Sequence, residues 1–102
     1  MSLSLQVLYP QAEGTHFDHA YYNSTHMAIV AKQIGAQIES TMVIKGLAGG
    51  PGTAPPFHAI ATIRFADQAS MDEAMTKMGP AVADIPNFYN GTPLTMIGEI
   101  VG

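Results

Sequence analysis

The chain has 102 residues, no cysteine and a formal net charge of −4, with 47% hydrophobic and 12% charged residues. This length fits one domain, residues 1–102, and the lack of cysteine excludes disulfides and thiolate catalysis. The four basic residues are scattered and no apolar run approaches membrane length, so we expect binding to neither nucleic acid nor membrane. We expect a cytoplasmic protein whose few charges favour self-association.

The first half of the chain predicts a strand, a helix and a second strand. Residues 3–9 alternate apolar and mixed side chains, as a half-buried strand does. A helix is expected over residues 18–34, with Asp18 as its N-cap and Gly35 at its end. Residues 38–47 form the next strand. Residues 46–56 hold four glycines and three prolines, which predicts a long loop acting as a lid or as an arm over a neighbouring subunit.

The second half predicts a strand, a helix and a final strand. Residues 57–65 form the third strand, and Ser70 with Glu73 forms a capping box that starts a helix. Gly79-Pro80 should stop that helix, and residues 81–89 should return irregularly or as a brief helix before a strand at 92–101. The order βαββαβ with right-handed crossovers predicts a ferredoxin-like α+β fold. Its four-stranded antiparallel sheet should carry both helices on one face.

The two faces of this sheet differ in character. The face toward the helices should hold Leu3, Leu5, Val7, Phe57, Ala59, Ala61, Ile63, Phe65, Leu94, Met96 and Ile100. The other face should hold Gln6, Leu8, Thr41, Val43, His58, Ile60, Thr62, Arg64, Thr95, Ile97 and Glu99. This second face is too apolar to meet water comfortably. We therefore expect a homodimer with twofold symmetry in which two sheet faces pack together as a barrel.

Polar chemistry concentrates at the start of the first helix. Asp18, Tyr22 and His26 lie four residues apart and share one helix face. A tyrosine hydroxyl and an imidazole that enter one enclosed space can act as an acid–base pair. The alternative for His26 is a buried imidazole satisfied by a backbone carbonyl, and for Tyr22 a core aromatic with its hydroxyl at the rim. Asp18 is too far from His26 for direct contact and acts as the N-cap.

Three further residues are candidates for binding a ligand. His58 begins the third strand and either enters the same cavity or lies in the dimer seam. Asn87 can donate and accept a hydrogen bond, and Phe88 can supply an apolar wall. Both lie in the stretch 84–89, which alternatively is a turn locked by Pro86 alone.

The remaining polar residues indicate no cofactor and no metal. His16 and His19 supply nitrogen ligands near His26, but no carboxylate stands beside them at ligand spacing. The glycines of the 46–56 loop lack a phosphate-loop pattern. The single arginine, Arg64, either binds an anionic group of a substrate or pairs with Glu99 across the sheet.

Three motifs in this order resemble the EthD family. They are Phe17-Asp18-x-x-Tyr21-Tyr22-x-x-x-His26, then His58-Ala59-Ile60-Ala61 leading to Phe65, then Asp84-Ile85-Pro86-Asn87-Phe88. Family members often have proline where this chain has Ala28. The resemblance implies the dimeric α/β-barrel superfamily, whose relatives include cofactor-free monooxygenases and lactone isomerases. The family is named after a protein encoded with an ether-degrading oxygenase system.

The first functional hypothesis is a cofactor-free catabolic enzyme or accessory protein of the EthD type, acting as a homodimer. It would perform proton transfer of the isomerase or lyase kind, or oxygenase-associated chemistry, on a small apolar compound that bears oxygen. His26 and Tyr22 would be catalytic, and Asn87, Phe88 and His58 would bind the substrate. The alternative is a non-catalytic protein, either a binder of small ligands or a structural dimer.

Overall fold

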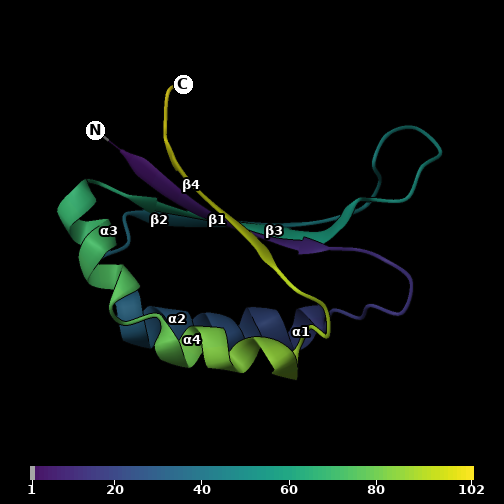
Figure 1. Cartoon of the computed structure of the whole chain (residues 1–102), viewed down its shortest axis with the longest axis horizontal. Helices are drawn as coiled ribbons and strands as arrows, with labels where there is room; N and C mark the ends of the chain where they lie inside the picture. Colours follow the sequence, from purple (N-terminus) through teal and green to yellow (C-terminus); the bar gives the residue numbers. More distant parts are fainter. Residues whose placement is uncertain (1) are drawn as a thin grey trace.

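A four-stranded antiparallel sheet forms one layer of the molecule, and the helical segments form the other (Figure 1). The computed structural model describes residues 2–102. The sheet order is β2-β3-β1-β4, and every neighbouring pair is antiparallel. The strands are β1 (Leu3–Pro10), β2 (Ser40–Lys45), β3 (Phe57–Phe65) and β4 (Leu94–Glu99). The ferredoxin-like α+β fold is confirmed.

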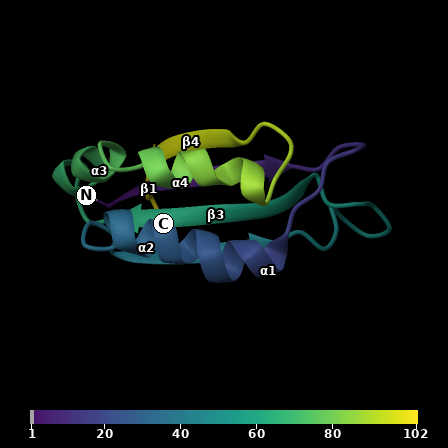
Figure 2. The ribbon, with the colours of Figure 1, turned by 90° about the horizontal axis from the view of Figure 1, so that it is seen from below.

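Two helical rows lie across the same face of the sheet (Figure 2). The first row is continuous and consists of α1 (His19–Tyr21), the π-helical η1 (Tyr22–His26) and α2 (Met27–Ile34). The second row consists of α3 (Gln68–Met75), α4 (Gly79–Asp84) and the 3₁₀ turn η2 (Ile85–Asn87). No described helix is long and apolar enough to span a membrane.

The helix starts follow local capping chemistry, with one difference from the sequence prediction. Asp18 is confirmed as an N-cap, because its Oδ1 accepts the backbone N–H of Tyr21 at 3.0 Å. The predicted Ser70 cap is wrong. Asp67 caps α3 instead, and its carboxylate accepts the backbone N–H of Ser70 at 2.8 Å. Pro80 does not end a helix but lies in the first turn of α4, where its missing N–H costs nothing.

The π-helical turn explains why buried residues in the first row recur every four positions. Tyr22, His26, Val30 and Ile34 are all at most 5% exposed. In a regular α-helix, residues four apart drift by about 40° around the axis. In η1 the backbone N–H of Met27 bonds to the carbonyl of Tyr22, five residues back, so this turn holds more residues and reduces the drift. Tyr22 and His26 therefore both face the sheet.

The faces predicted for the two edge strands are wrong. Opposite residues in an antiparallel pair share a face, and Thr95 pairs with Val7 while Leu94 pairs with Leu8. The helix-facing side therefore takes Thr41, Val43, Thr95 and Ile97, and Ile100 lies beyond β4. We name the opposite side the open face. Its apolar members are Leu8, Met42, Ile44, Ile60, Leu94 and Met96.

Arg64 makes an ion pair other than the one expected. Its Nε lies 2.6 Å from Glu39 Oε1, just before β2, and its Nη2 donates to Ser2 Oγ at 3.2 Å. The predicted pairing with Glu99 is wrong, because Glu99 lies on the helix-facing side of the sheet and Arg64 lies on the open face. The single arginine is thus engaged outside the space between the helices and the sheet.

The connection between β2 and β3 is an arm without a helix. It extends past the end of the sheet and rises on the side away from the helices (Figure 1). At its tip, Gly50 and Thr53 form a single antiparallel bridge. At its base lies a groove of about 500 Å³ that includes Ile44, Leu47 and Ile60. The groove is continuous with the open face, because Ile44 and Ile60 belong to both.

Candidate functional site

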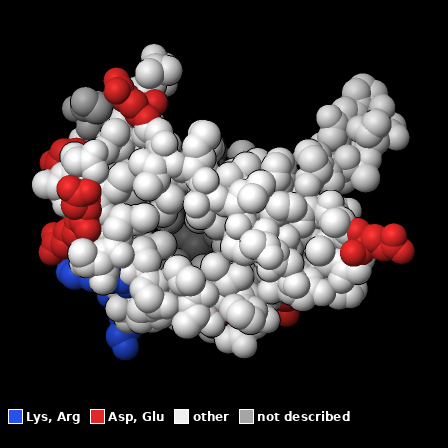
Figure 3. Space-filling view, viewed as in Figure 1, with Lys and Arg blue, Asp and Glu red and all other residues white. Residues whose placement is uncertain are grey.

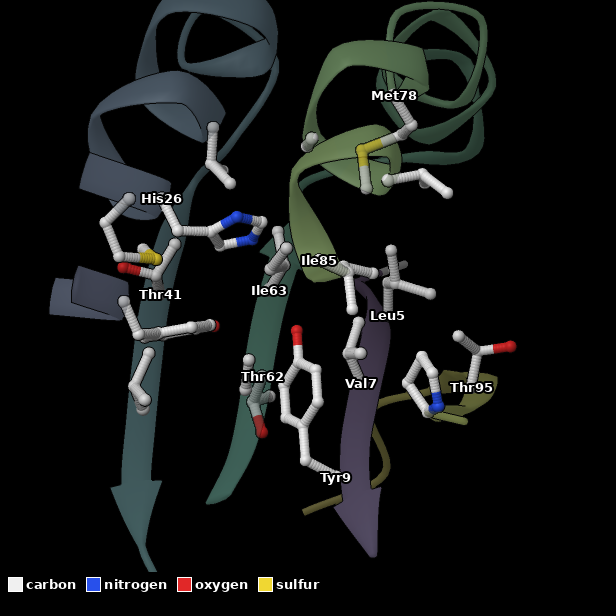
Figure 4. A pocket seen from close by; sticks show the side chains of 18 of the residues that line it. Leu5, Val7, Tyr9, His26, Thr41, Thr62, Ile63, Met78, Ile85 and Thr95 are labelled. Carbon is white, nitrogen blue, oxygen red and sulfur yellow. The ribbon is translucent and has the colours of Figure 1, made fainter. Parts of the chain in front are cut away.

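A cavity of about 220 Å³ lies between the helical rows and the sheet. All four strands contribute to its wall, together with η1, α2, α3, α4 and η2. No Asp, Glu, Lys or Arg is among the lining residues. The side chains that bring polar atoms to it are chiefly Tyr9, Tyr22, His26, Thr41 and Thr95. In the close view, the His26 ring and the Tyr9 hydroxyl both point toward the middle of this space (Figure 4).

The imidazole of His26 is held by a carboxylate from the other helical row. His26 is 5% exposed and Asp84 is 7% exposed, and His26 Nδ1 lies 2.9 Å from Asp84 Oδ2. His26 ends η1 and Asp84 ends α4, so the pair joins two helices that are far apart in sequence. A buried carboxylate is stable only when its oxygens are well bonded.

The other oxygen of Asp84 is bonded twice. Tyr21 donates its hydroxyl to Asp84 Oδ1 at 2.6 Å, and Asn87 donates its side-chain amide to the same atom at 3.0 Å. Burial raises the pKa of Asp84, but the hydrogen bonds from Tyr21, Asn87 and His26 outweigh it, so the pKa lies below its usual value. Asp84 is therefore an ionised carboxylate at neutral pH.

The ionised state of Asp84 fixes the tautomer of His26. A carboxylate only accepts hydrogen bonds, so Nδ1 of His26 must be the atom that carries the proton. In the neutral imidazole, Nε2 then keeps its lone pair and can take up a proton. If it does, the resulting imidazolium is stabilised by the adjacent carboxylate. In this arrangement His26 can act as a general base, and the Asp84 carboxylate orients its ring.

Aromatic rings pack around this pair. The Tyr22 ring stacks on the His26 ring at 5.0 Å between centroids, and the Phe88 ring lies at 4.5 Å from it. Tyr9 contacts both Tyr22 and Phe88 in edge-to-face geometry. Such packing restricts His26 to one ring orientation.

The two tyrosines at the cavity remain neutral. Burial raises the pKa of Tyr22 to about 12. Burial, and then the neighbouring Tyr22, raises the pKa of Tyr9 further above its ordinary range. Both hydroxyls can therefore donate a hydrogen bond to an oxygen of a ligand at neutral pH.

The structure brings together only part of the predicted site. His26 and Tyr22 both line the cavity. Asn87, Phe88 and His58 are not among its lining residues. Asn87 uses its amide on Asp84, and Phe88 packs behind His26. His58 lies beyond the cavity, where its Nε2 is 2.8 Å from Thr15 Oγ1 and its ring stacks on Phe17.

Sequence reasoning gave no role to Asp84, Tyr21 or Tyr9. Asp84, the partner of His26, is 58 positions away in the chain, so no local sequence pattern predicts that the two residues pair. One signal was available for Asp84. It follows Ala81 by three positions and precedes Phe88 by four, so an acidic residue stands on an otherwise apolar helical face. A carboxylate in such a row needs a buried partner.

The described residues contain no group of three or more His, Cys, Asp or Glu side chains that could hold a metal ion. The two carboxylate oxygens of Asp84 already accept hydrogen bonds from three side chains. At the cavity, His26 offers an acid–base group, and Tyr9 and Tyr22 offer neutral hydrogen-bond donors.

Comparison with known proteins points to one family. No family model matches the chain, and no curated protein matches it. Among solved structures, an EthD-like protein from Ralstonia eutropha JMP134 aligns with a TM-score of 0.89 and 34% identity, over 99% of this chain and 93% of that protein. An ethyl tert-butyl ether D (EthD) family protein from Bacillus halodurans C-125 aligns with 0.76 and 24%, over 99% and 100%. SnoaB, a cofactor-independent oxygenase from Streptomyces nogalater, aligns with 0.64 and 11%, over 97% and 91%. The last two show the fold alone.

Proposed function

Because the chain belongs to the EthD family, we propose that it is a cofactor-free enzyme that moves protons on a small, neutral compound bearing a carbonyl or phenolic oxygen. The observation that carries this proposal is the buried His26–Asp84 pair, which presents imidazole Nε2 toward an otherwise apolar cavity. A histidine needed only for packing would not require an ionised carboxylate, because burying that charge is costly.

The reaction we propose begins at a carbon next to a carbonyl group. Nε2 of His26 removes a proton from that carbon, and the electron pair of the C–H bond moves onto the carbonyl oxygen. Tyr22 donates a hydrogen bond to the oxygen as negative charge develops on it. When the substrate is a β,γ-unsaturated ketone, the protonated His26, stabilised by Asp84, then returns the proton to the γ-carbon of the dienolate, and the double bond moves into conjugation with the carbonyl group, which isomerises the substrate. It can instead protonate a leaving group at the β-carbon, which completes an elimination.

The other predicted site residues take different places in this proposal. Asn87 is a positioning residue, because it holds Asp84, which in turn orients His26. Phe88 supports the His26 ring from behind. His58 has no part in the chemistry, and Tyr9 joins Tyr22 as a second neutral donor.

The proposal is tested by isotope exchange, which needs no knowledge of the natural substrate. An enzyme that removes a proton next to a carbonyl group should accelerate the exchange of hydrogen for deuterium in a panel of small cyclic ketones dissolved in D₂O. Proton NMR measures the rate. If no neutral ketone exchanges faster with the protein than with an equal concentration of imidazole buffer, proton transfer from a carbon acid is excluded.

Oxygenation is the second candidate, and the fold shared with SnoaB favours it. The same deprotonation would give an electron-rich enolate or phenolate that can react directly with dissolved O₂. Oxygen uptake with a bound phenol or anthrone as the probe would distinguish this route. Isotope exchange without oxygen uptake supports isomerisation or elimination instead.

We further propose that the protein acts as a homodimer through its open face. The apolar side chains Met42, Ile44, Leu94 and Met96 on this face are 50–57% exposed in the single chain. A second copy of the same face would cover them under twofold symmetry. The arm rises on this side of the sheet and would reach along the partner (Figure 1).

Ile60→Glu should convert the dimer to a monomer. Ile60 lies on β3 between Leu8 and Ile44, so the substitution would bury a charge in the centre of the interface. We expect the dimer dissociation constant to rise by about a hundredfold or more. Sedimentation velocity at micromolar concentration measures this. Ala28→Glu, on the exposed side of α2, is the matched control and should remain dimeric. A monomeric native protein would refute the interface.

Shortening the arm should weaken the dimer without unfolding the subunit. Residues 48–54 are exposed apart from the half-buried Gly50, and Leu47 at the base of the arm is 83% exposed. Replacing residues 48–54 with two glycines should therefore change the melting temperature of the monomeric Ile60→Glu protein very little. In the native background it should raise the dimer dissociation constant. Unfolding in the monomeric background would contradict this assignment.

A further inference from the structure

The cavity has a buried end that holds the tyrosines and His26, and an exposed end that is mainly apolar. Tyr9 and Tyr22 are each 2% exposed and His26 is 5% exposed. At the other end the lining residues Met75, Val82 and Ile97 are 43%, 55% and 56% exposed. The cavity therefore opens to solvent between α4 and β4, where the lining is mainly apolar and Thr95 adds one exposed hydroxyl.

This opening is visible on the surface. The space-filling view shows a hollow where β4 and α4 lie in front, and the atoms around it belong to uncharged residues (Figure 3). Charged side chains gather toward the ends of the molecule instead. An apolar rim around a cavity mouth is a binding feature, because exposed apolar side chains gain free energy when a ligand covers them.

The lining excludes a charged ligand. A carboxylate or phosphate in the cavity would lose its water and meet no lysine or arginine. Arg64, the single arginine, is occupied by Glu39 outside the cavity. A volume of about 220 Å³ is also smaller than the sites that hold drug-sized molecules. The occupant must be small and neutral.

We infer that the substrate is a neutral amphiphile: its oxygen-bearing end lies against His26 and the tyrosines, and an apolar tail leaves the cavity between α4 and β4. This inference rests on the proposed function for the role of the buried end. The mouth residues Val82 and Ile97 contact the tail and set the preferred tail length. The tail also orients the substrate. Because the tail binds at the mainly apolar opening, the oxygen-bearing end and the reacting carbon are held at the other end, near Nε2.

A series of 4-alkylcyclohexanones tests the inference by isothermal titration calorimetry. Lengthening the alkyl group from methyl to butyl should tighten the dissociation constant about two- to threefold per methylene, somewhat less than complete burial would give. The anion 4-oxocyclohexanecarboxylate should bind at least about a hundredfold more weakly than 4-butylcyclohexanone. Ile97→Glu should reduce the butyl-to-methyl affinity ratio to below about three. Val101→Glu, at a 90% exposed position beyond β4, is the matched control and should keep the native ratio.

Each alternative outcome has a definite meaning. The inference is overturned if no ketone of the series binds, if affinity is independent of tail length, or if the carboxylate binds as well as the neutral ketones. It is also overturned if Ile97→Glu, with a native melting temperature, keeps the native ratio. Isotope exchange tests the proposed function separately. If affinity rises with tail length but no isotope exchange occurs, the binding inference holds and the proposed catalysis is wrong. If exchange occurs but affinity is independent of tail length, the proposed catalysis holds and the binding inference is wrong.

Discussion

Replacing His26 by asparagine should lower kcat/KM for ketone isotope exchange by about 10²–10⁴, the usual contribution of a general base. Asparagine retains a side-chain N–H that can bond to Asp84, so the buried carboxylate keeps a partner. It has no atom basic enough to remove a proton from carbon. Exchange should be followed by NMR in D₂O for native and variant proteins at equal concentration.

The matched control is His16→Asn, which removes an exposed histidine that does not line the cavity. This variant should exchange at the native rate. If His26→Asn instead lowers the melting temperature and leaves exchange unchanged, His26 is a structural residue and the catalytic proposal is wrong. If both proteins bind ketones and neither catalyses exchange, the chain is a non-catalytic binding protein.

The fold could be predicted because the central elements carry clear periodic signals. β1 and β3 alternate, and the long first helix repeats apolar residues every four positions. The edge strands carry no such signal. β2 reads Ser-Thr-Met-Val-Ile-Lys and β4 reads Leu-Thr-Met-Ile-Gly-Glu, so both faces are partly apolar. Their faces are set by hydrogen-bond register with the central strands, and a shift of one residue inverts every side chain.

The residues of the candidate site also fall into two groups, those that the sequence could predict and those that it could not. His26 and Tyr22 could be found because they lie on one helix and their spacing is local. Asp84 could not be paired with His26, because only the packing of two helical rows on one sheet brings them within 2.9 Å. The π-helical turn could not be predicted from the sequence either. It is stabilised by the packing it permits, since it brings Tyr22 and His26 to the sheet together.

Asp84→Asn should flip the tautomer of His26. Oδ1 of Asp84 accepts from Tyr21 and from the amide of Asn87, and the Asn87 amide nitrogen cannot accept a hydrogen bond in return. The new NH₂ group of the variant is therefore driven to the side facing His26. There it must donate to Nδ1, which moves the imidazole proton to Nε2. The lone pair that faced the cavity is lost, so isotope exchange should fall about 10²–10⁴-fold.

The same substitution should lower stability in a pH-dependent manner. The pKa of Asp84 is depressed in the folded state, so its stabilising contribution is complete above the unfolded value of about 3.9 and is lost as the pH falls through the lower folded value. At pH 7 we expect the variant to lose about 2–4 kcal/mol of unfolding free energy. The difference from the native protein should shrink below about pH 4. Urea unfolding at pH 7 and at pH 3 measures both values.

Long-range ¹H–¹⁵N NMR of the imidazole distinguishes positioning from simple support. A native His26 should show a protonated Nδ1, and the Asp84→Asn protein should show a protonated Nε2. Asp72→Asn, at an exposed carboxylate on α3, is the matched control and should keep the native tautomer, stability and exchange rate. If Asp84→Asn keeps the Nδ1–H tautomer and the native exchange rate while losing stability, Asp84 only supports the fold. In that case the Asp84 carboxylate does not determine whether Nε2 of His26 carries the proton.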